Sequence, residues 1–485
     1  MDRSLRSRSL RQSIDWSLVI CYLVLCVIGL INIYASVYSS NPSSIFDLSV
    51  RSGKQFLWMM VSLGIGATIL FLIPARLWEN LSIPGYAIVL VLLVAVIFLG
   101  HEVKGSHSWF SFGPIKFQPA EISKISTSLL LAYVMSREGF KISKVKDFIK
   151  VALIIIIPML VILAEKEAGS ALVYVGFMFM LYREGLSGWF IVAFGLGILL
   201  FVLTLTTSPF ISIMVLLSCI SIFNCLNGNK MWKGLLEHMA FLVPMGFLPL
   251  IWSKINPESA FKFLLEIDPV YILIGAAAIA VPFLIYKAFR EKAHYLYVSA
   301  IGFIAGTIMV FSTSFLFNNV LQDHQRGRIE VLLGMKEDPS GVGYNVNQSM
   351  IAIGSGGLTG KGFLHGTQTA YGFVPEQTTD FISCTIGEEW GFLGSTSVIL
   401  LYVFLMMRII YDAEKSREKF TRIYGYCIAC CIFMHMFINI GMTIGIMPVI
   451  GIPLPLISYG GSSIVTFTIL IFIFIALDRQ EKKYF

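Results

Sequence analysis

Long apolar runs recur along almost the whole chain, and no other feature of the sequence constrains its fold as strongly. A helix needs about 17 to 25 mostly apolar residues to cross a membrane. The runs that fit or approach this length are 16–38, 56–74, 82–100, 117–135, 149–163, 169–182, 188–206, 209–226, 236–252, 269–287, 294–318, 382–408, 424–446 and 452–477. Only 13% of the residues are charged, about half the share found in typical soluble proteins. The sequence therefore predicts an all-α polytopic membrane protein with about 14 transmembrane helices.

The basic residues are unevenly distributed between the two sides that these runs define. With the N-terminus inside, 24 of the 36 Lys and Arg residues fall in inside segments, 11 fall in outside segments, and Lys124 lies within a run. Such a bias marks the cytoplasmic side of membrane proteins. We therefore expect both termini in the cytoplasm and a large extracytoplasmic loop at 319–381. The net charge of +7 then belongs to a membrane surface, and no nucleic-acid partner is expected.

Two ionisable residues of opposite charge occur within one predicted helix. Glu121 and Lys124 are three positions apart in KFQPAEISKIS, so they share a face of the helix. Charges inside a membrane are costly and mark functional sites by default. The sequence leaves two interpretations open, a self-neutralised structural pair and a polar site that faces a cavity within the bundle.

The predicted outer loop carries cations that suit an anionic ligand. Its segment GSGGLTGKG departs from the nucleotide-binding P-loop pattern, because Ser355 and Gly362 replace the required Gly and Ser or Thr. We expect instead a flexible Gly-rich loop in which Lys361 is free to meet an anion. Arg326 and Arg328 open the same loop, and Arg side chains bind phosphate in a bidentate manner. Contact with lipid headgroups is the other interpretation of these two arginines.

Two carboxylates lie at the end of this loop, in the segment PEQTTDF. Glu376 and Asp380 stand just before an apolar run resumes at Phe381. A positioned carboxylate can act as a general base. The alternative is an ordinary polar turn in which Asp380 caps the following helix. The cysteines and histidines of the chain show no metal-ligand spacing, so they predict no metal site.

Several motifs of the chain together resemble one family. GIPLPLISYGGSS at 451–463, FQPAEISK at 117–124 and EAGSALV at 167–173 are similar to signatures of the SEDS family of bacterial cell-wall proteins (shape, elongation, division and sporulation). HQRGRI, NQSMIAIGSGGLTGKGFLHGTQT and FVPEQTTDFISCTIGEEWGFLG follow in the family's order. The GTQT and PE-x-x-TDF forms resemble the elongation branch, RodA, more than the division branch, FtsW.

The resemblance implies a fold and a domain organisation. The family normally has ten spans, so four helices are expected to be added here. The expected organisation is one integral membrane domain over 1–485, with N-terminal helices at 16–206, about four inserted helices at 208–294, the catalytic loop at 319–381 and C-terminal helices at 382–477.

The resemblance also implies an activity. Members of the family are peptidoglycan glycosyltransferases that polymerise lipid II, the undecaprenyl-diphosphate-linked disaccharide-pentapeptide, into nascent glycan. They work with a class B penicillin-binding protein, a transpeptidase, and with the elongation machinery. The expected location is the bacterial cytoplasmic (inner) membrane, with the active site facing the periplasm or cell exterior. A lipid II flippase, a division-type FtsW-like paralogue and a non-catalytic scaffold are the alternatives.

Site residues follow from matching the motifs. Asp380 matches the family's essential loop aspartate, and Glu121 and Lys124 match its membrane-embedded polar pair. Ser458, in the 451–463 motif, is expected to bind substrate. The chain departs from the family at Glu167, where Asp is usual. It also has Thr378 where His is frequent in the elongation branch, and Ser108 where Arg is common.

These assignments predict a mechanism. Asp380 is expected to take the proton of the acceptor hydroxyl as general base. A single displacement would invert the anomeric centre, as in inverting glycosidases. Arg326, Arg328 and Lys361 are candidates to stabilise the leaving polyprenyl diphosphate, and a divalent cation, Mg²⁺ or Mn²⁺, is a candidate to share that role. Glu376 is expected to orient Asp380 or to contact the acceptor sugar.

Overall fold

The computed structural model divides the chain into two compact units. Unit 1 comprises Met1–Ser187 and Asp338–Phe485, and unit 2 comprises Gly188–Glu337. The structure describes residues 14–38, 44–103, 106–112, 115–227, 239–240, 242–244, 246–247, 269–319, 321, 323–336 and 343–484. The predictions of a single domain and of an insertion bounded at 208–294 stay predictions.

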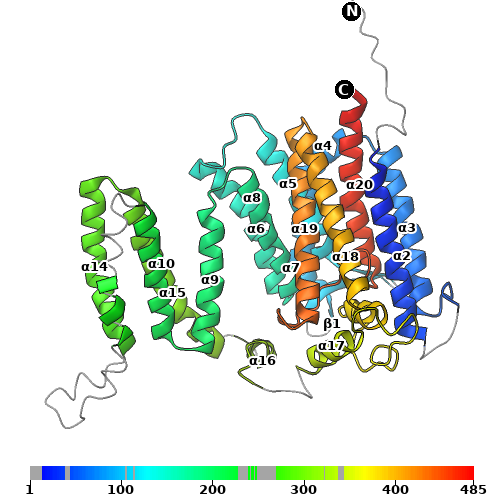
Figure 1. The fold of residues 1–485 in the computed structure, drawn as a ribbon. Helices are drawn as coiled ribbons and strands as arrows, with labels where there is room; N and C mark the ends of the chain where they lie inside the picture. The colour runs from blue at the N-terminus through cyan, green and yellow to red at the C-terminus, as the bar shows by residue number, and fades with distance from the viewer. Residues whose placement is uncertain are drawn as a thin grey trace, which may run out of the picture. The chain divides into compact units, whose positions relative to one another are not determined.

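Unit 1 is a helical bundle with a small sheet at one end (Figure 1). Its helices are α2 (Trp16–Tyr38), α3 (Arg51–Phe71), α4 (Arg76–Leu99), α5 (Pro119–Ser136), α6 (Val145–Ala164), α7 (Ala168–Val173), α8 (Phe177–Arg183), α17 (Tyr344–Ser355), α18 (Ile382–Lys415), α19 (Lys419–Thr443) and α20 (Gly461–Tyr484). Helix α20 packs against α3, and α19 packs against both α18 and α5. Helices α5, α19 and α20 are largely buried, so the residues in the middle of this bundle are shielded from lipid.

Unit 2 has a core of its own. Its helices are α9 (Trp189–Thr206), α10 (Pro209–Asn227), α14 (Pro269–Glu291), α15 (His294–Asn319) and α16 (Asp323–Leu332). Leu200, Leu216, Leu273 and Phe303 are buried together between these helices. At Gly306 a Cβ atom would lie 2.5 Å from the Leu216 side chain, so a larger residue there would require Leu216 to move.

The described helices agree with the predicted spans in most places. Eleven helices in the described part of the chain are long and apolar enough to cross a membrane. The predicted run 117–135 corresponds to α5, which is not among the eleven and carries Glu121 and Lys124. The run 169–182 is divided into α7, a 3₁₀ turn and α8. Most of the predicted run 236–252 lies outside the described residues.

Two features were not predicted. Helix α20 begins at Gly461, not at 452, because Pro453 and Pro455 cannot continue a helical hydrogen-bond ladder. Residues 451–460 therefore form a loop (the 451–460 loop). A three-stranded antiparallel sheet of order β1-β2-β3 separates α4 from α5. Its strands are β1 (His101–Val103), β2 (Ser106–Phe112) and β3 (Ile115–Phe117).

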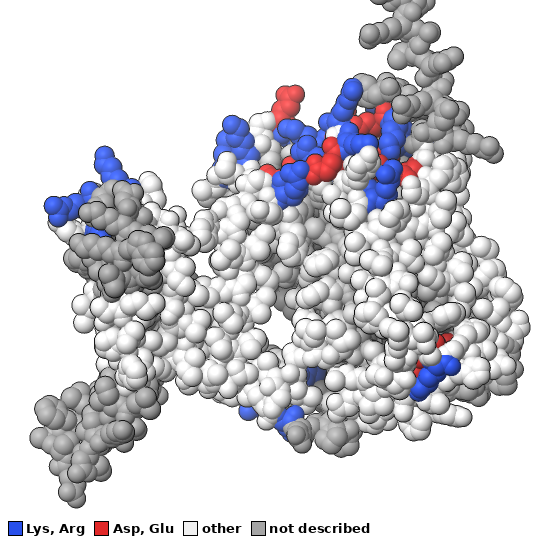
Figure 2. All heavy atoms as spheres, in the orientation of Figure 1, with Lys and Arg blue, Asp and Glu red and all other residues white. Residues whose placement is uncertain are grey.

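Charged side chains are concentrated at one end of unit 1. Figure 2 shows Lys, Arg, Asp and Glu gathered where the C-terminal end of α20 lies, above a broad band almost free of charge. Such a band is what the apolar interior of a membrane requires. The arrangement is that of a multi-pass membrane protein. The basic residues at this end agree in kind with a cytoplasmic face, although the predicted orientation of the termini stays a prediction.

Candidate functional site

The segment that carries Asp380 is a compact turn immediately before α18. Glu376 adopts a left-handed conformation with φ of 52°. Its carbonyl oxygen accepts hydrogen bonds from Thr379 N at 3.1 Å and Phe381 N at 3.2 Å. The Thr379 hydroxyl donates to the Glu376 carboxylate at 3.2 Å. Residues 375–381 (the 375–381 turn) therefore have a defined backbone.

Three consecutive carbonyl groups tie this turn to the bundle. Thr378 O accepts from Tyr459 N at 2.8 Å, Thr379 O accepts from Ser458 Oγ at 2.6 Å, and Asp380 O accepts from Asn439 Nδ2 at 2.8 Å. The donors come from the 451–460 loop and from α19. The backbone on which the half-buried Asp380 carboxyl stands is thus fixed on its bundle side.

The 451–460 loop also approaches the Asp380 side chain. A Cβ atom at Gly451, where φ is 76°, would lie 3.4 Å from Asp380 Oδ2. Ser458 accepts a hydrogen bond from Leu454 N at 2.8 Å, so its hydroxyl holds the loop together while it donates to the turn. Substrate binding by Ser458 stays a prediction, and the contacts described here are structural.

The predicted polar pair lies inside the bundle. Lys124 Nζ is 2.7 Å from Glu121 Oε1, and the Lys124 side chain is fully buried. Lys124 Nζ also lies 2.8 Å from His435 Nε2, and His435 Nδ1 lies 3.2 Å from Pro453 O. Glu121 Oε2 has no hydrogen-bond partner among the described residues. The pair is therefore only partly satisfied among the described residues, and a substrate-binding role for it stays a prediction.

Helix α19 connects this pair to the 375–381 turn. His435 and Asn439 stand one turn apart on α19. Asn439 Nδ2 donates to Ile452 O at 2.7 Å as well as to Asp380 O, and Asn439 Oδ1 accepts from Ser383 Oγ at 2.8 Å. One helix face therefore positions both the buried pair and the loop carboxylate.

A second acidic turn joins the same region. Ser108 Oγ donates to Glu167 Oε1 at 2.7 Å, so β2 supports the residue that stands where the family has Asp. The Glu165 carboxyl is buried, and neither of its oxygens has a hydrogen-bond partner among the described residues. Burial raises the pKa of Glu165 to about 8, and the neighbouring Glu167 charge adds to this increase. A Cβ atom at Gly169 would meet Ile452 Cγ1 at 2.8 Å, so this turn packs against the 451–460 loop.

Lys361 is not free, contrary to the prediction. Its Nζ lies 2.7 Å from Glu388 Oε1 and 2.8 Å from Thr367 Oγ1. The buried Glu388 carboxylate also accepts from the backbone N–H groups of Thr367, Gln368 and Thr369 at 2.7 to 2.9 Å. The Gly-rich loop is therefore clamped to the start of α18.

The predicted site residues are divided between the two units of the chain. Arg326 and Arg328 belong to unit 2, on α16, whereas Asp380, Glu376 and Lys361 belong to unit 1. Arg326 Nε is 2.8 Å from Glu330 Oε1, and Arg328 is exposed. A shared phosphate site for these arginines and Asp380 stays a prediction.

Sequence reasoning missed Glu388, Arg51 and Gln55. Glu388 stands inside a predicted apolar run, so the rule applied to Glu121 would have selected it too. Arg51 Nη1 donates to Thr378 Oγ1 at 2.5 Å, and Gln55 Oε1 accepts from Gly460 N at 3.2 Å. No local pattern in the sequence indicates these two contacts between distant segments.

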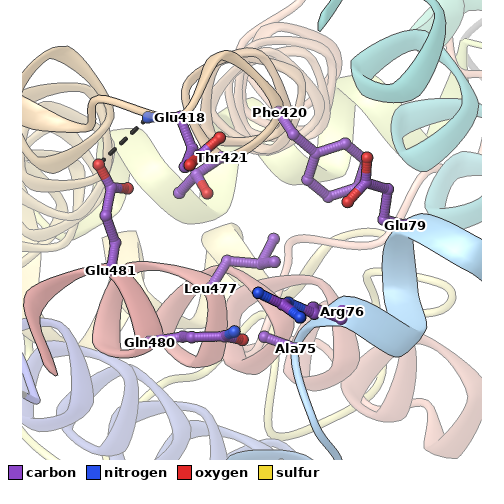
Figure 3. Close-up of a pocket in the computed structure, with 9 residues that line it drawn as sticks. All are labelled: Ala75, Arg76, Glu79, Glu418, Phe420, Thr421, Leu477, Gln480 and Glu481. Carbon is purple, nitrogen blue, oxygen red and sulfur yellow. Dashed lines mark hydrogen bonds between the residues drawn. The ribbon is translucent and has the colours of Figure 1, made fainter. Parts of the chain in front are cut away.

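A pocket lies at the charged end of unit 1, away from these residues. Its volume is about 410 Å³, and Figure 3 shows its lining by Arg76 and Glu79 of α4, Glu418 and Phe420 at the start of α19, and Glu481 of α20. None of the predicted site residues lines it. In the described part of the chain, no group of three or more His, Cys, Asp or Glu residues is placed to hold a metal ion. A role for Mg²⁺ or Mn²⁺ stays a prediction.

Comparison with known proteins agrees with this architecture. The profile of the family described as "Cell cycle protein" (FTSW/RODA/SPOVE) matches residues 15–223 and 278–483. The chain belongs to this family. Residues 224–277 of this chain, which the profile does not match, fall within the predicted insertion.

Relatives in the FTSW/RODA/SPOVE family include RodA-type proteins. Over 394 residues the chain is 29% identical to the peptidoglycan glycosyltransferase MrdB of Escherichia coli K12, covering 81% of this chain and 76% of that protein. It is 29% identical to the peptidoglycan glycosyltransferase RodA of Treponema pallidum over 468 residues, covering 96% and 98% of the two chains. A chain in the solved structure of a peptidoglycan synthase complex matches with a TM-score of 0.60 at 21% identity, over 96% of this chain and 98% of that one. The RodA-like fold is therefore shared.

Proposed function

We propose that this protein is a peptidoglycan glycosyltransferase that polymerises lipid II into glycan strands for cell-wall elongation. The observation that carries the proposal is the fixed backbone of Thr378, Thr379 and Asp380, which presents a carboxyl at the end of the loop. The names of the MrdB and RodA relatives support the reaction class.

Asp380 acts as the general base in this proposal. The acceptor sugar hydroxyl becomes a competent nucleophile when a positioned carboxylate takes its proton, which contributes about 10²- to 10⁴-fold in rate. The hydroxyl oxygen forms a bond to the anomeric carbon of the donor as the bond to the diphosphate oxygen breaks. The displacement inverts the donor centre. The three carbonyl contacts reduce the reorganisation that the Asp380 backbone would otherwise undergo.

The leaving polyprenyl diphosphate requires cations nearby. Lys361 already neutralises Glu388, so its charge is shared between the clamp and any ligand. Arg326 and Arg328 remain candidates from unit 2. Glu121 Oε2, which has no hydrogen-bond partner among the residues that the structure describes, offers an acceptor for a donor group of the substrate. Ser458 and Glu376 contribute by holding the 375–381 turn.

The proposal includes a partner and an orientation. The related solved structure is a synthase complex described as coordinating polymerization and crosslinking, which supports a class B penicillin-binding protein as the partner here. The charged end shown in Figure 2 supports a cytoplasmic location for the C-terminus. The 375–381 turn then faces the outside of the bacterial inner membrane, where lipid II is polymerised.

The test is polymerisation of labelled lipid II by the purified protein with its cognate transpeptidase. We expect long glycan from the wild type and a loss of about 10²-fold or more in Asp380→Asn. Asp47→Asn, at an exposed position between α2 and α3, is the matched control and should retain wild-type polymer. Equal polymer from wild type and Asp380→Asn would remove Asp380 from the chemistry. If the folded wild-type protein makes no polymer but transports lipid II across the membrane of vesicles, the flippase hypothesis is favoured instead.

A further inference from the structure

The segment between α17 and α18 exposes large apolar side chains. Four of them, Leu358, Phe363, Tyr371 and Phe373, form the outer apolar patch together with Trp390 and Phe392 of α18. Tyr371 is 73% exposed, Leu358 64% and Phe392 63%. Soluble surfaces rarely expose so much apolar area in one place, and such patches mark contact with a membrane or partner.

Defined contacts hold several members of the patch. The rings of Phe363 and Trp390 lie 6.1 Å apart, and those of Tyr371 and Phe373 lie 6.5 Å apart. Leu393 N donates to Leu358 O at 3.1 Å. This pairing is possible because α18 is broken at Gly391, where φ is 62°. The loop is therefore bonded to the helix that carries the rest of the patch.

The patch carries almost no free charge. Residues 343–375 contain a single charged side chain, Lys361. Its partner Glu388 is buried, and the two lie 2.7 Å apart. An ion pair reduces the cost of bringing a lysine to a medium of low polarity. His365, whose Nδ1 lies 2.8 Å from Phe363 O, is the one histidine of residues 343–375.

The patch continues onto a lipid-facing surface. Helix α18 is long and apolar enough to span a membrane, and beyond Phe392 it exposes Leu400, Phe404 and Met407. In Figure 2 the end of unit 1 at which α17 lies shows few charged atoms. Trp and Tyr side chains prefer the boundary between headgroups and acyl chains.

We propose that the outer apolar patch inserts into the outer leaflet of the membrane, at the boundary between phospholipid headgroups and acyl chains. The loop then rests on the bilayer instead of projecting into solvent. The clamp between Lys361 and Glu388 permits this placement because it pairs the single charged side chain of residues 343–375. The choice of the outer leaflet rests on the orientation proposed above, whereas the lipid contact itself is independent of the proposed polymerisation activity.

The experiment uses the full chain in phosphatidylethanolamine and phosphatidylglycerol vesicles. An environment-sensitive fluorophore is attached at Tyr371→Cys, in a Cys219→Ser background because Cys219 is the cysteine that is only half-buried. Lys54→Cys is the reference, since Lys54 is exposed on the first turn of α3, beside the Arg51 that contacts the 375–381 turn. We expect brominated lipids to quench the Tyr371 label about twofold or more strongly than the Lys54 label, and aqueous iodide to show the reverse order.

A second reporter at Phe373→Cys guards against a local defect at Tyr371. Each labelled protein is compared with wild type by size-exclusion profile and thermal unfolding. If iodide quenches both patch labels as strongly as it quenches the Lys54 label, the lipid contact is overturned. The patch would then be a surface for a partner protein that the vesicles do not contain. Protection of both labels from iodide and from brominated lipids alike would also overturn it, since the patch would then be covered by protein.

Discussion

Two buried carboxylates of unit 1 pair with a lysine at the same distance, yet their surroundings differ. Glu121 and Lys124 lie on one helix, and Glu121 Oε2 has no partner among the described residues. Glu388 pairs with Lys361 across two segments, and three backbone N–H groups and two Thr hydroxyls complete its shell. A carboxylate whose two oxygens have all their hydrogen bonds holds neighbouring segments in place. A carboxylate with an oxygen that lacks a partner can still accept a hydrogen bond from a ligand.

Glu165 extends this comparison. Its carboxyl is as buried as the other two, but neither of its oxygens has a hydrogen-bond partner in the part of the chain that the structure describes. Its pKa is raised to about 8 by burial and by Glu167, so it is protonated near neutral pH. Glu388, Glu121 and Glu165 thus form a series in which the carboxyl group has a full set of hydrogen-bond partners, a partial set, and none among the described residues. Their variants should differ accordingly.

The largest effect is expected at the buried pair. Lys124→Met leaves the Glu121 carboxylate without its cation inside the bundle. Loss of one partner of a buried pair costs about 3–5 kcal/mol. The free energy of unfolding in detergent micelles should fall by this amount.

The double variant Glu121→Gln, Lys124→Met is the matched control. Both charges are then removed with little change of shape, so most of the lost stability should return. A double variant as unstable as Lys124→Met would show that packing, and not the unpaired charge, determines the loss. Polymerisation by the stable double variant would then report whether the pair contacts substrate.

Glu388→Gln should have a smaller and local effect. The amide offers one acceptor oxygen where the carboxylate offered two, and its NH₂ group faces backbone donors. Each buried donor left unsatisfied costs about 1–3 kcal/mol, but the loop can open to water and limit the loss. Hydrogen exchange should show faster exchange at Thr367, Gln368 and Thr369.

Glu389→Gln is the neighbouring control for this experiment. Glu389 is also buried but makes none of the contacts to Thr367–Thr369 that are described for Glu388. Exchange at the three amides should remain as in the wild type. Faster exchange in both variants would mean that the loop depends on the start of α18 as a whole and not on one carboxylate.

The sequence predicts the local features of this protein better than it predicts the contacts between distant segments. Long apolar runs indicate the helices because the thickness of the membrane fixes their length. The predicted start of α20 at 452 is wrong because Pro453 and Pro455 lie within the first residues of that run. The motif around Asp380 indicated a segment that the structure shows as a turn bonded to the bundle, and its role as the active site stays a prediction. The bonds from Ser458, Tyr459 and Asn439 to its carbonyl groups join residues 59 to 81 positions apart, and contacts over such separations leave no local pattern. The prediction that Lys361 is free is wrong because its partner, Glu388, stands inside a predicted apolar run.

Glu165 should make stability depend on pH. In the unfolded chain the carboxyl loses its proton near the ordinary pKa of about 4.5, whereas in the folded protein it keeps the proton until about pH 8. Folding therefore takes up a proton between these values, and stability falls as pH rises through this window. The decrease is at most about 1.4 kcal/mol per pH unit, and less once the turn relaxes.

Glu165→Gln removes this titration and keeps the shape. Thermal unfolding measured from pH 5 to pH 8 should show a flatter profile for the variant than for the wild type. At pH 8 the variant should be the more stable of the two. Parallel profiles would show that Glu165 is already solvated in the folded protein.

The smallest effect is expected for Lys361→Met. The Glu388 carboxylate keeps its bonds to the backbone and hydroxyls of the 367–369 segment, so removal of the lysine does not leave it unsatisfied. The side chain of Lys361 is also 26% exposed, and water replaces part of the lost contact. We expect a loss of about 1 kcal/mol in unfolding free energy, well below that of Lys124→Met. Equal losses in the two lysine variants would show that distance alone sets the strength of these pairs, and the distinction between saturated and partly satisfied carboxylates would fail.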